Sequence, residues 1–228
     1  MLKGQISVGD YVKVVSFLRA NYPLNNVVLV SPGGDVNEAL KIGRLFRKYL
    51  ISTIAPTDLG GGSTYLSAPE CKGQNCGTCA SACALIWFGG VERTGTMGVH
   101  RPQINDATFA GLSPADASNR YRRLLARITA YLEEMEVPNS ITEAMVATSS
   151  GDIRWVDVID DNLQRPPSTA EWVDASCGAR GPYLEEIKQN TLERLSPQRR
   201  SAIERQYRDN LSCEGLLFDK YIDQMPRP

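Results

Sequence analysis

Ser81 and His100 are the two residues of this chain whose types could together carry out nucleophilic catalysis. A serine hydroxyl becomes a nucleophile when a base removes its proton and nearby donors stabilise the oxyanion that forms. His100 is the only histidine in the 228 residues, so no other imidazole could act as this base. Ser81 lies in the run Cys-Ala-Ser-Ala-Cys-Ala (79–84), whose small side chains would let a substrate or another backbone approach closely. Taken alone, Ser81 could equally begin a buried helix, and His100 could be an ordinary polar residue.

A glycine-bearing turn, Ser-Pro-Gly-Gly-Asp at residues 31–35, could supply backbone donors to the same site. Successive N–H groups in such a turn can point at an anion or an oxyanion. The turn is not a phosphate-binding loop, because it has neither the spacing nor the Lys-Ser/Thr pair of that motif. Pro and Gly are common in turns for conformational reasons alone. The turn therefore indicates a functional site only in combination with Ser81 and His100.

Cysteine is the unusual feature of the composition. The six positions are Cys71, Cys76, Cys79, Cys83, Cys177 and Cys213. The first four have the spacing C-x4-C-x2-C-x3-C, whose first three members match a plant-type iron–sulfur pattern. Four thiolates would also suit zinc. A cluster, a zinc site, free buried thiols and disulfides are therefore all open at this stage.

Disulfides are the main expectation among these alternatives, and we expect no cofactor. Cys177 and Cys213 flank a pair of charged helical stretches and could clamp them together. In the preceding loop we favour a bond between Cys71 and Cys76. Cys79 and Cys83 are then either paired or free.

Charge and hydropathy exclude several classes of protein. The 25 basic and 26 acidic residues leave a net charge of −1, which gives no support for a nucleic-acid binder that relies on a basic surface. No apolar run is long enough for a membrane helix, and the first residues lack the apolar region of a signal peptide. A chain of 25.1 kDa can bury a core without requiring disulfides.

The first hundred residues alternate between expected strands and helices. The apolar run at 27–30, bounded by turn signals, is typical of a strand buried on both faces, and Asp35 can cap the helix that follows. The expected helices lie near 11–18, 35–50 and 80–88, and the expected strands at 27–30, 52–55 and 96–100. This order predicts an α/β fold with parallel strands joined by helices.

Two segments depart from this alternation. Residues 57–78 lack periodicity and predict a long irregular loop. Ser113 followed by proline predicts the start of a long helix with one apolar face, which ends before Pro138, and a shorter helix is expected at 140–147.

The last part of the chain reads as a separate unit. Arg-Pro-Pro-Ser at 165–168 predicts a boundary, and 184–195 and 197–211 are amphipathic, charged helical stretches. We therefore expect one domain at 1–165 and a small helical extension at 166–228.

Three motifs that follow one another in this order along the chain are a more specific indication of a family than any one of them alone. They are a strand followed by Ser-Pro-Gly-Gly and a helix, then Ala-Ser-Ala-x-Ala before an apolar helix, then a strand ending in Val-His-Arg-Pro. Together they resemble the Clp protease proteolytic subunit, of the ClpP/crotonase fold, over residues 1 to about 162. The likeness is strongest to divergent bacterial ClpP-like proteins, often periplasmic, that carry a cysteine-rich serine motif. The resemblance implies an α/β stacked ββα superhelix, here with a helical C-terminal appendage.

The resemblance also implies an activity and roles for individual residues. It implies a serine-type peptidase in which Ser81 attacks a peptide carbonyl and His100 is the general base. The turn at Gly33 and Gly34 would bind the substrate, with the N–H groups of Gly34 and Ala82 as oxyanion donors. Peptide or protein is then the expected substrate, through acyl transfer.

The third member of the implied triad is an aspartate before an aromatic–aliphatic pair, beyond the long helix. Asp152 is the best candidate, although it stands one residue further from Trp155 than the family pattern has it. Asp157 is the fallback, and a solvated turn aspartate is the simpler interpretation of Asp152.

Other departures bear on partners and location. This sequence has no counterpart of the segment that helps the family dock an unfoldase ring. Conversely, the tail from 166 onward has no counterpart in the family. We therefore do not expect an unfoldase partner. A homo-oligomer is compatible with the resemblance. The cysteines and the resemblance favour a periplasmic or extracytoplasmic location, whereas the lack of a visible signal peptide leaves the cytoplasm open. The competing functions are a catalytically inactive ClpP-like binding or scaffold protein, a crotonase-type acyl-CoA enzyme, and a cluster or metal protein.

Overall fold

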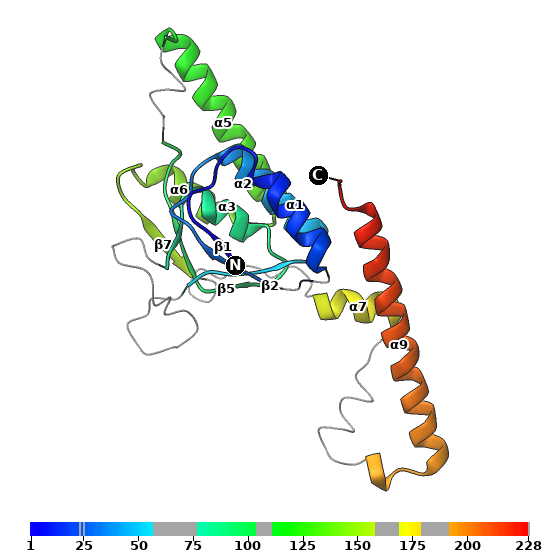
Figure 1. Cartoon of the computed structure of the whole chain (residues 1–228). Helices are drawn as coiled ribbons and strands as arrows, with labels where there is room; N and C mark the ends of the chain where they lie inside the picture. The colour runs from blue at the N-terminus through cyan, green and yellow to red at the C-terminus, as the bar shows by residue number, and fades with distance from the viewer. Residues whose placement is uncertain are drawn as a thin grey trace.

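Short parallel strands joined by helices form the larger of two sheets (Figure 1). The computed structural model describes residues 1–22, 24, 26–56, 77–103, 111–157, 169–178 and 192–227. All neighbours in this sheet are parallel, in the order β1 (Leu2–Lys3), β2 (Asn26–Val30), β3 (Ser52–Ile54) and β5 (Arg93–Thr94). The apolar run at 27–30 and the segment from Ser52 therefore form strands, as expected.

The second sheet begins where β2 ends. It contains, in order, β4 (Cys79–Ala80), β6 (Thr96–Val99) and β7 (Arg154–Asp157). β4 and β6 are parallel, and β6 and β7 are antiparallel. Ser31, just past β2, donates its N–H to Thr78 O at 2.8 Å and accepts from Ala80 N at 3.0 Å. These bonds fix the start of β4 against the end of β2.

Most of the expected helices are present with the expected caps. The α-helices are α1 (Asp10–Asn21), α2 (Val36–Lys48), α3 (Ala82–Phe88), α5 (Pro114–Glu134), α6 (Asn139–Ala147), α7 (Thr169–Cys177) and α9 (Pro197–Gln224), with a 3-10 turn η1 (Leu192–Arg194). Asp35 and Ser113 accept hydrogen bonds from the first turns of α2 and α5, which satisfies N–H groups that have no partner inside a helix. α9 runs well beyond the 197–211 stretch, because its apolar residues continue to Tyr221. The α/β class is confirmed, and the stacked superhelix stays a prediction.

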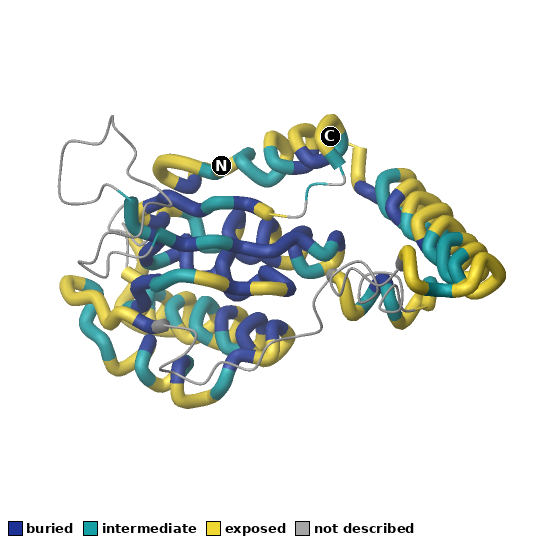
Figure 2. The backbone as a smooth tube through the Cα atoms, turned by 90° about the horizontal axis from the view of Figure 1, so that it is seen from below, coloured by how far each residue is buried: buried dark blue, intermediate teal, exposed yellow. Residues whose placement is uncertain are grey.

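α3 is the centre of the core. All seven of its residues are buried, and Figure 2 shows buried backbone running through the middle of the body. α2 packs directly on it: a Cβ on Gly89 would collide with the backbone of Gly43, so the two helices touch where neither has a side chain. Burial of large residues such as Trp87 and Phe88 stabilises the fold by roughly 1.5–3 kcal/mol each. The helix that follows Ser81 is therefore rigidly held.

Arg93 fixes the far end of α3. Its buried guanidinium donates to Phe88 O at 2.6 Å, to Gly90 O at 3.2 Å and to Met135 O at 2.7 Å. These carbonyls lie at the C-terminal ends of α3 and α5, where helices leave acceptors without partners. Burial lowers the pKa of Arg93 to about 10, so it stays charged at neutral pH. Arg93 thereby ties the two helix ends together, and Arg47 donates to the same three carbonyls.

Glu38 caps a helix to which it does not belong. Its buried carboxylate accepts from the N–H groups of Gly9 at 3.2 Å and Tyr11 at 2.9 Å, at the start of α1, and from Lys41 Nζ at 2.7 Å. Burial by itself raises the pKa of this carboxyl, but the bonds from Lys41, Tyr11 and Gly9 outweigh it, and the pKa lies below its ordinary value. The carboxylate thus joins α2 to α1.

Replacing Glu38 with Gln should lower the free energy of unfolding by about 1–3 kcal/mol at pH 7, because buried donors lose a charged acceptor. Because the folded pKa is depressed, this stabilisation is present above the ordinary glutamate pKa and is lost as the pH falls through the folded value. Urea unfolding at pH 7 and under acidic conditions measures the difference. Exposed Glu133→Gln is the control. A difference between Glu38→Gln and wild type that did not shrink on acidification would contradict the capping role.

The end of α9 docks on the core. Arg19 donates to the carbonyls of Ile222 at 3.1 Å and Met225 at 2.8 Å, and Tyr49 Oη donates to Gln224 O at 2.9 Å. Edge-to-face ring pairs join the same surfaces, Tyr22 with Phe218 and Tyr49 with Tyr221. A third pair, Trp172 with Tyr221, joins α7 to α9. The C-terminal extension is therefore attached to α1 and α2 through the last turns of α9.

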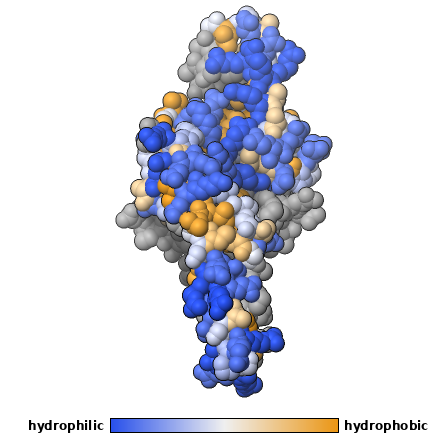
Figure 3. Space-filling model, turned by 90° about the vertical axis from the view of Figure 1, so that its right-hand side faces the viewer, coloured by the Kyte–Doolittle hydropathy of each residue, from blue (hydrophilic) through white to orange (hydrophobic). Residues whose placement is uncertain are grey.

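The rest of α9 and the first half of α5 extend away from the body in different directions (Figure 1). The face on the α9 side is mostly hydrophilic, with apolar surface gathered near its middle (Figure 3). Among the helices of the described residues, none has the length and apolar character needed to cross a membrane. Residues 57–76 of the loop predicted at 57–78, the boundary at 165–168 and most of the 184–195 stretch lie outside the described residues. The division at 165 therefore stays a prediction.

Candidate active site

Ser81 occupies the sharp turn between β4 and α3. Its backbone has φ 59° and ψ −126°, a combination that residues with a Cβ rarely adopt because the side chain crowds the backbone. Nucleophilic serines on strand-to-helix turns use a strained conformation of this kind to present the hydroxyl. The Ser81 side chain is half-buried and does not cap α3. Its conformation is therefore not explained by helix capping.

The turn is held to its neighbours by backbone hydrogen bonds. Ser81 N donates to Gly98 O of β6 at 2.9 Å, and Ser81 O accepts from Ala84 N at 3.0 Å. On the other side, Ala80 N donates to Ser31 O at 3.0 Å. Ser81 is thus fixed between the end of β2 and the end of β6.

The glycine turn packs directly against Ser81. Gly33 has φ 104°, and a Cβ placed on it would lie 2.7 Å from Ser81 Cβ and 2.9 Å from Ala82 N. Only glycine fits a position with both this conformation and this closeness. Ser31 Oγ accepts from Gly33 N at 3.1 Å, and Gly33 O accepts from Ile6 N at 2.8 Å. The sequence-predicted partnership between this turn and the serine is therefore a direct contact.

Two N–H groups near Ser81 are candidates for oxyanion donors. Within the part of the chain that the structure describes, neither Gly34 N nor Ala82 N donates a hydrogen bond. Ala82 is the first residue of α3, where N–H groups have no helical acceptor, and Gly34 is held by Asp35 N donating to Ile6 O at 2.8 Å. As far as the described residues go, both donors are free to bind a developing negative charge.

His100 follows β6 at the same end of the sheet as Ser81. The parallel register pairs Ala80 with Gly98, so Ser81 and His100 both come directly after paired strands. The half-buried imidazole has Nδ1 2.8 Å from Arg101 O. A carbonyl can only accept, so the neutral imidazole that fits this contact has its proton on Nδ1 and its lone pair on Nε2. This is the tautomer that a general base requires.

Asp152 and Asp157 lie at opposite ends of β7. The antiparallel register pairs Val99 with Arg154, and one step further places Ile153 opposite His100. Asp152 immediately precedes Ile153. Its backbone N–H donates to Ser149 O at 3.0 Å, which closes a turn, and its side chain is exposed. Asp157 pairs with Thr96, four residues from His100 and so roughly 13 Å along the strand.

The three predicted triad residues are brought to one sheet end but are not joined. Among the described residues, no hydrogen bond links the side chains of Ser81, His100 and Asp152. Arg101 N donates to Thr148 O at 3.0 Å, which anchors the backbone after His100 to the end of α6. Catalytic hydrogen bonds are often formed only when substrate is bound.

Sequence reasoning did not assign three residues that shape this site. Gly98 provides the carbonyl that holds Ser81, and a Cβ on it would lie 3.2 Å from both Ala80 Cβ and Trp155 Cζ3. A glycine inside a strand signals such a close approach. Trp155 and Ile153 lie across from Gly98 and His100, and each is nearly half exposed, so an apolar surface borders the serine.

Two disulfides are formed in the described part of the chain. Cys79 is bonded to Cys83, and Cys177 to Cys213. The second confirms the expected Cys177–Cys213 pairing, which joins α7 to α9, and the first settles that Cys79 and Cys83 are paired. Neither is then a thiolate for a metal cluster, and the described residues hold no other group of His, Cys, Asp and Glu side chains suited to a metal ion. The expected Cys71–Cys76 bond lies outside the described residues.

Comparisons with known proteins add one structural likeness. No protein-family model and no curated protein matches the chain. Among solved structures, the chain is similar to a ClpP1 mutant from Listeria monocytogenes, with 15% sequence identity and a TM-score of 0.44, over 69% of this chain and 81% of that chain. At this level the likeness assigns no role to any residue.

Proposed function

We propose that the chain is a serine-type peptidase with a ClpP-like fold. The main support is the strained backbone conformation of Ser81, which lies at a strand-to-helix turn in direct contact with Gly33. A fold retains such a conformation only when its surroundings hold it, and strained residues cluster at functional sites. The N–H groups of Gly34 and Ala82, which have no acceptor among the described residues, and the contact of His100 Nδ1 with Arg101 O support the same proposal.

In the proposed reaction, Ser81 Oγ bonds to the carbonyl carbon of a peptide while His100 Nε2 takes the hydroxyl proton. The carbonyl oxygen becomes an oxyanion that accepts hydrogen bonds from Gly34 N and Ala82 N. As the C–N bond breaks, the leaving amine takes the proton from His100. Water then attacks the acyl-enzyme ester, with His100 again as base, and releases the acid. Asp152 is the proposed third member, which would support the imidazolium.

The proposed substrate is a peptide or protein in an oxidising compartment. Disulfides form and persist outside the cytoplasm, and two are present here. We therefore propose an extracytoplasmic location.

A fluorophosphonate probe tests the proposal. Untagged wild-type protein should take up one label per chain, Ser81→Ala should take up none, and Ser16→Ala, which removes a hydroxyl exposed on α1, should label like the wild type. Labelling that survives Ser81→Ala would remove Ser81 as the nucleophile. A wild type that never labels would favour the second candidate, a non-catalytic ClpP-like binding protein.

A further inference from the structure

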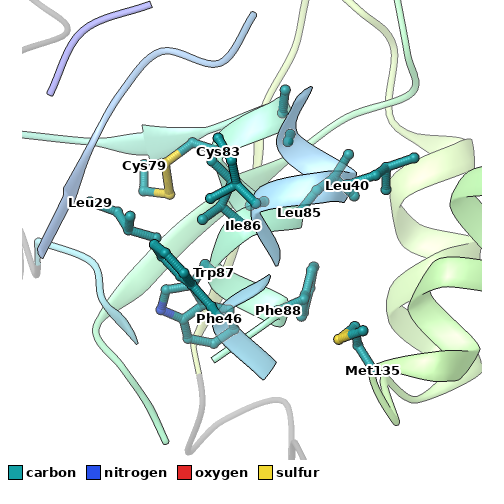
Figure 4. Packing of buried hydrophobic residues seen from close by; sticks show 14 of the residues in the cluster. Leu29, Leu40, Phe46, Cys79, Cys83, Leu85, Ile86, Trp87, Phe88 and Met135 are labelled. Carbon is teal, nitrogen blue, oxygen red and sulfur yellow. A yellow bond between two sulfur atoms is a disulfide. The ribbon is translucent and has the colours of Figure 1, made fainter. Parts of the chain in front are cut away.

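A disulfide closes the turn that carries Ser81. Cys79 is in β4 and Cys83 is in α3, so the bond joins the strand before the serine to the helix after it. The two Cα atoms are 5.3 Å apart across a separation of four residues. Figure 4 shows the bond among core side chains, with Leu29 and Ile86 nearby. Ser81 is thus the middle residue of a covalently closed loop of five.

The other contacts of Ser81 do not constrain the turn in this way. The bonds from Ser81 N to Gly98 O and from Ala80 N to Ser31 O fasten the turn to neighbouring strands. Ala80 and Ala82 flank the serine with single methyl groups, which give it little packing. Only the disulfide connects the two arms of the turn covalently, and a strained conformation persists only where the surroundings over-determine it.

We propose that the Cys79–Cys83 disulfide is a positioning element that holds Ser81 in its reactive backbone conformation. This inference rests on the proposed function in so far as it speaks of reactivity. Both cysteines are completely buried, so dissolved reductants do not reach the bond in the folded protein, and it is a permanent part of the site. Cys177–Cys213 is half-exposed and joins α7 to α9, so it serves as the matched control.

The test compares two double variants, Cys79→Ala/Cys83→Ala and Cys177→Ala/Cys213→Ala. Fluorophosphonate inactivation is resolved into the maximal rate constant kinact and the half-saturating concentration KI. Loss of the Cys79–Cys83 bond should lower kinact by about 100-fold with KI nearly unchanged, because a small misplacement of a reacting group has an effect of that size. Loss of the other bond should lower Tm but leave both constants unchanged. Equal kinact in wild type and Cys79→Ala/Cys83→Ala would overturn the proposal.

Two further measurements keep the test decisive. If Cys79→Ala/Cys83→Ala does not fold, wild type is unfolded, reduced and refolded: kinact should fall and return on reoxidation, and a reduced, folded protein with unchanged kinact would overturn the proposal. If wild type does not react at all, the proposed function fails, and amide hydrogen exchange at Ser81 and Ala84 decides the positioning claim. Faster exchange without the disulfide supports positioning, and equal exchange refutes it.

Discussion

Replacing His100 with Gln is expected to lower the rate at which Ser81 reacts with a fluorophosphonate by about 100- to 10,000-fold, the usual contribution of a general base. In the neutral imidazole a proton on Nδ1 faces Arg101 O, which leaves Nε2 to accept the serine proton. Glutamine has a similar reach but is not a base. Circular dichroism and Tm should show that the variant folds like the wild type, since His100 is only half-buried.

The single histidine allows an independent control. Diethylpyrocarbonate should modify one imidazole per untagged chain and block labelling of Ser81 in the wild type, and hydroxylamine should restore it. Asp152→Asn should have a smaller effect than His100→Gln, because a backbone carbonyl already orients Nδ1. Undiminished labelling of His100→Gln would exclude His100 as the base.

Replacing Gly33 with Ala is expected to damage both stability and reactivity. At φ 104° an L-residue is strained by about 1–3 kcal/mol, and a Cβ 2.7 Å from Ser81 Cβ and 2.9 Å from Ala82 N adds about 1–3 kcal/mol of overpacking. Relief of that contact would push Ser81 and the turn apart. Labelling should therefore fall by about 100-fold, the cost of a displacement near 1 Å.

Gly4 provides the matched control for this substitution. It has φ 101°, but no atom lies within 4 Å of the position that a Cβ would take. Gly4→Ala should therefore lose only the strain energy in denaturant unfolding and should label at the wild-type rate. Equal effects of the two substitutions on labelling would show that the contact between Gly33 and Ser81 has no part in the reaction.

The elements with strong local signals could be predicted from the sequence. Asp35 and Ser113 cap the helices that they were expected to cap, because an acceptor before an apolar periodic stretch is a local feature. β4 was missed, since its two residues adjoin an apolar helix of similar composition. Its strand character comes from pairing with Met97 and Gly98, which no local pattern encodes.

The candidate residues of the proposed site could be named from the sequence, but their geometry could not. The motif order identified Ser81, His100 and the turn at Gly33, whereas the strained backbone of the serine depends on contacts with β6 and on a disulfide. The pairing of Cys79 with Cys83 could not be chosen from spacing, because connectivity depends on the fold. The register that places Ile153, and not Asp152, opposite His100 is likewise set by sheet pairing.

A crystal structure of the protein after reaction with diisopropyl fluorophosphate tests the central claim most directly. We expect a covalent bond from Ser81 Oγ to phosphorus, with the phosphoryl oxygen about 2.7–3.1 Å from Gly34 N and Ala82 N, the range for oxyanion donors. His100 Nε2 should lie within hydrogen-bond reach of Ser81 Oγ. An adduct on another residue, or one on Ser81 whose phosphoryl oxygen points away from both N–H groups, would contradict the proposed site.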